Sequence, residues 1–203
     1  MTRYLKLMSG LVLFGTGLWL GLVADLGVGP WDVLTGGLSR QLGTPFGRTA
    51  IAISVVVLLI GLAARVRPGI GTLANVVVIG AVVDVLLATG LLDRLGEQPA
   101  ALRLIATVGG IACVAAGSAL YLGAHLGPGP RDGLMVALHA RTGWRVGTCR
   151  ALLECSVLVL GVLLGGPVGI GTLLFALGIG PAVQVAFPLL RQTPVARPVE
   201  APA

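Results

Sequence analysis

The 203-residue chain is too apolar for an ordinary soluble domain. Hydrophobic residues make up 56% of it and charged residues 11%, and its mean hydropathy is +0.98, whereas about a quarter of the residues in a soluble domain are charged. Six membrane spans of about 20 residues fit this length and leave only short connections, which excludes a separate soluble catalytic domain. The net charge of +6 therefore bears on membrane topology and does not indicate a nucleic-acid partner.

Six apolar stretches are long enough, or nearly so, to cross a bilayer. They cover residues 5–25, 48–65, 70–92, 102–124, 148–166 and 170–190. The first has the charge pattern of a signal peptide but no convincing small-residue cleavage site after it, so it is predicted to be a retained transmembrane helix. Residues 192–203 hold three prolines and no apolar periodicity, which predicts a disordered tail.

The basic residues predict the orientation of the spans. With a cytoplasmic N-terminus, all but four of the fourteen Lys and Arg residues lie on the cytoplasmic side; the four are Arg40, Arg48, Arg94 and Arg103. Because basic loop residues favour the cytoplasm, this distribution predicts that both termini are cytoplasmic.

The chain aligns with itself at an offset of 100 residues. Leu-Gly-Val-Gly-Pro-Trp-Asp at 26–32 aligns with Leu-Gly-Pro-Gly-Pro-Arg-Asp at 126–132, and Gly-Ile-Gly-Thr-Leu at 69–73 recurs unchanged at 169–173. Matches between Leu and Val arise easily by chance in an apolar chain, but shared Gly, Pro, Asp and Thr at fixed spacing do not. The pattern indicates an internal duplication.

The duplication predicts the fold class. Residues 1–100 form one repeat and residues 101–191 the other, and each contains three spans and one short segment. Because three is odd, the second repeat is predicted to enter the membrane upside down relative to the first. We therefore expect an all-α polytopic membrane protein with six transmembrane helices in a 3+3 inverted repeat.

The short segments, residues 30–43 and 130–143, are about 20 Å long as helices, against a hydrocarbon core of about 30 Å. Each starts with Gly at the cap, Pro at the first helical position and Asp in the first turn, which favours a helix start. These residues are Gly29, Pro30 and Asp32, and Gly129, Pro130 and Asp132. Two interpretations are open: re-entrant helices whose N-termini face a substrate, or amphipathic helices at the two interfaces. Stabilising a helix start is a sufficient role for both aspartates.

Gly-Pro-Trp-Asp-Val-Leu at 29–34 and Gly-Ile-Gly-Thr at 69–72 resemble motifs of the YczE/YyaS/YitT family of small bacterial integral membrane proteins. The resemblance covers nearly all of the chain except the tail. It implies a multi-span protein of the bacterial inner membrane and names no substrate. The second copy departs from the motif at Arg131, where the first has Trp31, so the two short segments need not have the same role.

Asp84 lies within the third apolar stretch, where an ionisable group is costly enough to suggest function. Its partner in the repeat is Gln184. One interpretation places both side chains in a single proton or cation site near the pseudo-symmetry axis, with backbone groups of the short segments. The alternative is that hydrogen bonds to neighbouring helices hold Asp84.

Thr72 and Thr172 occupy equivalent places in the repeated Gly-Ile-Gly-Thr-Leu and are predicted to cap the third and sixth spans, with substrate contact as the alternative. Asn75 adds a polar side chain one turn beyond Thr72. Gly17 and Gly21 form a Gly-x-x-x-Gly step, a packing surface for another helix or for a second copy in a homodimer.

No catalytic motif, metal-ligand spacing or cofactor motif is present in the sequence, so an enzyme is not expected. The paired short segments favour a secondary transporter or permease for a small solute or ion. The alternative is a non-transporting scaffold or accessory protein that supports a partner enzyme or exporter.

Overall fold

The computed structural model describes residues 2–192, apart from the side chains of Val136 and Val146. Within this part the chain forms eight α-helices and one short 3-10 helix, with no strand. The helices are α1 (Arg3–Ala24), α2 (Pro30–Leu42), α3 (Phe46–Ala63), α4 (Ile70–Ala88), η1 (Leu95–Glu97), α5 (Ala100–Leu122), α6 (Pro130–Thr142), α7 (Val146–Leu163) and α8 (Ile170–Leu189). The all-α class is confirmed. The tail predicted for residues 192–203 lies, apart from Gln192, outside the described residues.

Five of the described helices are long and apolar enough to cross a membrane: α1, α3, α4, α5 and α8. Helix α7, which corresponds to the apolar stretch 148–166, carries Arg150 and Glu154 in its first half. Large apolar side chains cover the outer surface of the helices; Leu163 and Leu189, for example, are both 76% exposed. Such a surface requires lipid rather than water around it, so the chain is a multi-helix membrane protein, and the count of six spans stays a prediction.

The two short helices, α2 and α6, begin and end where the sequence predicts. Pro30 and Pro130 occupy their first turns, and each helix ends at a glycine with left-handed backbone, Gly43 at φ 62° and Gly143 at φ 70°. Glycine suits this conformation because it has no Cβ to clash with the following carbonyl. At 13 residues each, both helices are shorter than a bilayer core.

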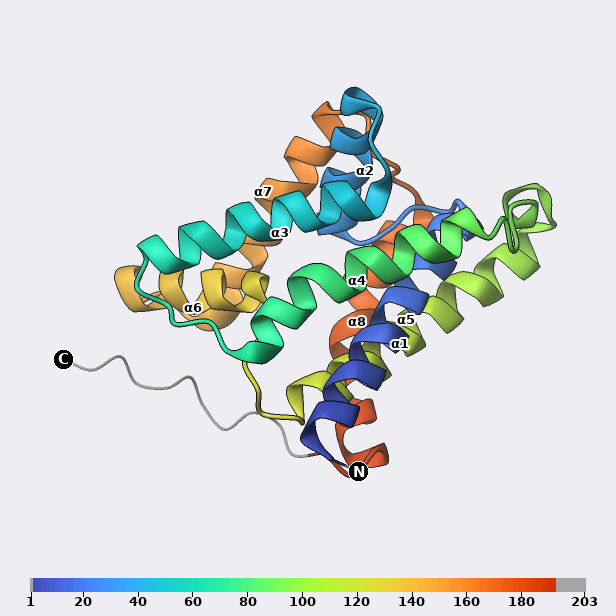
Figure 1. Ribbon diagram of the computed structural model, residues 1–203. Coiled ribbons are helices and arrows are strands. Elements are labelled where there is room, and N and C mark those ends of the chain that lie inside the picture. Colours follow the sequence, from blue (N-terminus) through green and yellow to red (C-terminus); the bar gives the residue numbers. More distant parts are fainter. Residues whose placement is uncertain (1, 193–203) are drawn as a thin grey trace.

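Helices α1 and α5 pack side by side (Figure 1), and glycines lie at their contact. Gly10 contacts Gly117 and Gly17 contacts Gly110, so residue numbers rise along one helix as they fall along the other, and the two helices are antiparallel. A Cβ on Gly17 would lie 2.5 Å from the carbonyl oxygen of Gly110. The predicted packing surface at Gly17 is therefore occupied by another helix of the same chain, whereas a Cβ on Gly21 would meet only Val28, at 3.9 Å.

The two halves hold each other through equivalent contacts. The amide of Gly71, at the start of α4, donates to the carbonyl of Leu126 (2.7 Å), and the amide of Gly171, at the start of α8, donates to the carbonyl of Leu26 (2.6 Å). Each short helix also packs against a helix of the other half: α2 against α7, and α6 against α3 (Figure 1). As a result, the N-termini of both short helices lie in the interior.

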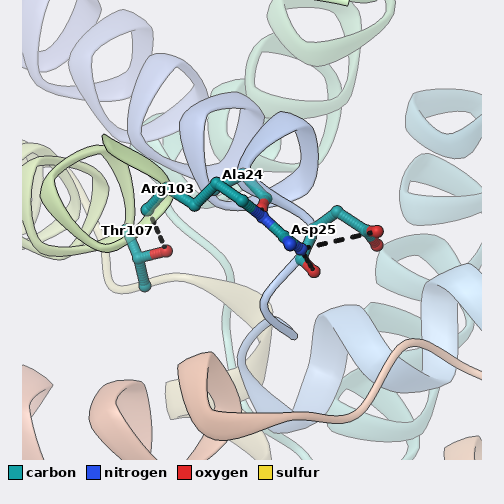
Figure 2. Close-up of polar contacts among 4 residues, drawn as sticks. All are labelled: Ala24, Asp25, Arg103 and Thr107. Atoms are coloured by element: carbon teal, nitrogen blue, oxygen red, sulfur yellow. Dashed lines mark hydrogen bonds and ion pairs between the residues drawn. The ribbon is translucent and has the colours of Figure 1, made fainter. Parts of the chain in front are cut away.

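Arg103, in the first turn of α5, fixes the end of α1 (Figure 2). Its Nε donates to the carbonyl of Ala24 at 2.8 Å, its guanidinium also donates to the carbonyl of Asp25, and the Asp25 carboxylate lies 3.7 Å away. Thr107 donates to the carbonyl of Arg103 one turn later. A cation suits a helix C-terminus because the last carbonyls carry the negative end of the dipole. This contact sets the position from which the chain leaves α1 toward α2.

Candidate functional site

A cavity of about 190 Å³ lies between the N-terminal turns of α2 and α6, and all eight α-helices contribute to its lining. Helices α1 and α8 contribute only apolar side chains to its wall, whereas α6 and α7 contribute most of the charged ones. The charged and hydroxyl-bearing side chains in the lining are Asp32, Ser54, Ser118, Tyr121, Arg131, Asp132, Arg150 and Glu154. The cavity therefore offers both hydrogen-bond acceptors and donors inside an apolar protein.

All six residues that the sequence analysis named at the starts of the short helices line this cavity. They are Gly29, Pro30, Asp32, Gly129, Pro130 and Asp132, together with Asn75. Asn75 lies beside Gly129, and its repeat partner Phe175 lies beside Gly29. The equivalent contacts place a polar group at the start of α6 and an aromatic ring at the start of α2.

Asp84 and Gln184 are not brought together, and neither lines the cavity. Asp84 lies one turn before the end of α4, where its carboxylate accepts the amides of Gly47 (2.6 Å) and Arg48 (3.0 Å) and so caps α3. Gln184 is exposed on α8. Helix α4 starts against the loop after α5, and helix α8 starts against the loop after α1. Because α1 and α5 are antiparallel, these two loops lie at opposite ends of the molecule. Equivalent positions near the ends of α4 and α8 therefore also lie at opposite ends.

Thr72 and Thr172 act at helix starts, as predicted. The hydroxyl oxygen of Thr72 accepts the amide of Gly69 (3.1 Å), and that of Thr172 accepts the amide of Gly169 (3.3 Å). Thr72 also donates to the carbonyl of Pro128 at 2.6 Å and so ties α4 to the loop before α6. Neither threonine lines the central cavity, and their capping role is confirmed.

Asp32 is the most deeply buried charged group of the cavity. Its side chain is 4% exposed, and its Oδ1 has no hydrogen-bond partner among the described residues. The nearest opposite charge is Arg131, whose guanidinium nitrogen lies 3.8 Å from that oxygen, beyond hydrogen-bond distance. Arg131 in turn lies 4.9 Å from the ring centre of Trp31, a cation–π distance. Asp32 and Trp31 come from the first repeat and Arg131 from the second, so this cluster joins the two halves.

Asp132, the repeat partner of Asp32, has a different environment. The hydroxyl of Tyr121 donates to its Oδ2 at 3.2 Å. Burial raises the pKa of both aspartates; the Arg131 guanidinium opposes this rise at Asp32, and the Tyr121 hydrogen bond opposes it at Asp132. The two halves therefore present one hydrogen-bonded carboxylate and one with an unused oxygen.

The sequence reasoning missed Arg131 and Arg150 as cavity residues. Glu154 forms an i,i+4 ion pair with Arg150 at 2.9 Å, and both residues line the cavity. A comparison of the two copies contains the signal, because charged residues of the second copy replace uncharged residues of the first. The pairs are Trp31 and Arg131, Ala50 and Arg150, and Ser54 and Glu154.

Residues 1–188 match a family of unknown function (DUF6198). An uncharacterized protein of Haemophilus influenzae is 40% identical over 190 residues, which are 93% of this chain and 84% of that protein. The uncharacterized membrane protein YczE of Bacillus subtilis is 30% identical over 92% of this chain and 86% of its own length, and YyaS of the same organism is 26% identical over 94% of each. These relatives support the YczE/YyaS resemblance. No solved structure matches the chain.

Proposed function

The chain belongs to the family of unknown function DUF6198, and from the geometry of its central cavity we propose that it is a small secondary transporter or permease for a small solute. One observation carries the proposal: Asp32, which lines the cavity between the two halves and is buried at the start of a short helix, has a carboxylate oxygen without a hydrogen-bond partner among the described residues. An unsatisfied charged oxygen is costly in an apolar interior. A ligand with a hydrogen-bond donor would remove that cost.

The proposed mechanism requires inverted halves that rock about the cavity and expose it to one side at a time. The antiparallel packing of the equivalent helices α1 and α5 supports inversion, and so do the matched hydrogen bonds from Gly71 to Leu126 and from Gly171 to Leu26. Six spans, cytoplasmic termini and an inner-membrane location belong to the same proposal. Asp32 belongs to one half and Arg131 to the other. A solute that binds to both side chains would therefore change the contact between the two halves.

Labelling of single cysteines tests the inversion. In a background from which Cys113, Cys149 and Cys155 are removed, we expect Arg40→Cys to react with a membrane-impermeant maleimide from outside intact cells and Ala140→Cys to react only after the cells are opened. Both positions are exposed and lie in equivalent short helices. Reaction of both cysteines from the same side would contradict the inverted arrangement.

Substitution of Asp32 tests the cavity as the binding site. We expect that screening the purified protein against metabolites and ions identifies a solute that raises its Tm, and that Asp32→Asn weakens this solute about tenfold or more, because a charge-assisted hydrogen bond is lost. Asp84→Asn is the matched control. It removes a carboxylate that caps α3 outside the cavity, so we expect a lower Tm with an unchanged response to the solute.

The accessory-protein alternative makes a different prediction for the same experiment. If no solute of the panel raises the Tm or enters proteoliposomes, or if Asp32→Asn keeps the full response, the cavity is not a transport site. In that case the partner enzyme or exporter becomes the object to identify.

A further inference from the structure

The Asp32–Arg131 pair has the charges of a salt bridge without its hydrogen bonds. The two groups are 3.8 Å apart, the Asp32 side chain is 4% exposed and that of Arg131 is 29% exposed. Among the described residues, Arg131 has no hydrogen-bond acceptor, and Oδ1 of Asp32 has no donor. Attraction between buried charges compensates for their loss of water only when hydrogen bonds satisfy the remaining atoms. This pair therefore leaves one set of donors and one acceptor for something that enters the cavity.

Arg131 is held in a suitable orientation for an anion. Its guanidinium lies 4.9 Å from the ring centre of Trp31, and a guanidinium against an aromatic ring keeps its N–H edges free. Those edges match the two oxygens of a carboxylate, which they bind as a pair of parallel hydrogen bonds. Asp32, in contrast, accepts hydrogen bonds, and a charged donor such as an ammonium group makes the strongest one.

The sign of the ligand follows from the two groups taken together. A solute with only a positive charge would satisfy Asp32 and would add a cation beside Arg131. A solute with only a negative charge would satisfy Arg131 and would add an anion beside the buried Asp32. A zwitterion satisfies both groups and leaves the net charge of the cavity unchanged, so the cost of burying charge is smallest for it.

The size and walls of the cavity restrict the rest of the solute. A volume of about 190 Å³ suits a small molecule, and Val83, Val114 and Ile179 supply an apolar wall. We propose, as an extension of the proposed function, that the cavity binds a small α-amino carboxylate, with its ammonium at Asp32, its carboxylate at Arg131 and a short apolar side chain. The two halves then contact opposite ends of one solute.

Three related probes test this inference: alanine, ethylamine, which lacks the carboxylate, and propionate, which lacks the ammonium. We expect alanine to bind the purified full-length protein, by titration calorimetry and by a rise in Tm, at least about tenfold more tightly than either of the others. Arg131→Gln should weaken the binding of alanine about tenfold or more and reduce the difference in affinity between alanine and ethylamine. Arg141→Gln, in the last turn of α6 and outside the cavity lining, should change neither.

The comparison of the three probes uses the unmodified protein, so it remains decisive even if Arg131→Gln does not fold. Ethylamine binding as tightly as alanine would overturn the inference and would leave the transporter proposal standing with a cationic solute. Absence of alanine binding at millimolar concentration would also overturn it, and the metabolite screen with Asp32→Asn would then decide separately whether the cavity is a transport site.

Discussion

Gly17→Ala is expected to prevent the close packing of α1 against α5. The new Cβ would lie 2.5 Å from the carbonyl oxygen of Gly110 and 2.8 Å from the amide nitrogen of Val114. Both are backbone atoms, so no side-chain rotation relieves the clash, and the helices must separate. Overpacking of this kind costs about 1–3 kcal/mol and occasionally more. We expect a fall in Tm of the purified protein in detergent or loss of its monodisperse peak in size-exclusion chromatography.

Gly21→Ala is the matched control, because Gly21 lies one turn later on the same helix and its Cβ would approach only a side-chain atom of Val28, at an ordinary 3.9 Å. There we expect an unchanged or slightly higher Tm, since alanine is a better helix former than glycine by about 1 kcal/mol. If Gly17→Ala and Gly21→Ala unfold at the same temperature as the unmodified protein, the glycine-mediated crossing of α1 and α5 is not as described.

Gly27→Ala is expected to disrupt the contact between the loop after α1 and the start of α8. Gly27 has φ +95°, which side chains rarely adopt, and its Cβ would lie 2.4 Å from the amide nitrogen of Gly169 and 2.7 Å from Oγ1 of Thr172. Left-handed backbone alone costs a residue with a Cβ about 1–2 kcal/mol, and the clash adds to this. The neighbouring hydrogen bond from Gly171 to Leu26 would be strained. We expect a lower Tm and loss of solute binding, because this loop leads directly to Asp32.

Gly43→Ala separates the effect of backbone conformation from the effect of the clash with α8. Gly43 also has positive φ, at 62°, but nothing lies within 4 Å of its Cβ. We expect a decrease in stability of about 1 kcal/mol from backbone conformation alone and full retention of solute binding. Equal losses of Tm and binding in Gly27→Ala and Gly43→Ala would show that the contact with α8 does not matter.

The helix boundaries could be predicted because their signals are local. Pro30, Asp32 and Gly43 occupy the first turn and the end of α2, and the same residue types recur at Pro130, Asp132 and Gly143 in α6. Each acts within a few residues of its own backbone, through a missing amide, a helix dipole or a left-handed turn. The capping role of Thr72 and Thr172 was predictable for the same reason.

The candidate site could be predicted only in part. An acid within an apolar stretch looks the same in sequence whether it faces a cavity or caps a helix, and Asp84 does the latter through the amides of Gly47 and Arg48. Asp32 looked like an ordinary first-turn residue. Its unpartnered oxygen became apparent only when α6 of the other repeat placed Arg131 at 3.8 Å.

Composition and the 100-residue repeat by themselves determined that this is a helical membrane protein with two related halves, each with a short helix of known start and end. They did so because hydropathy, proline and glycine influence the backbone within a few residues of their own position. Tertiary structure decided which helices exchange partners, with α2 against α7 and α6 against α3. It thereby decided which charges share the cavity, because that depends on close glycine contacts between segments about a hundred residues apart, which no local pattern encodes.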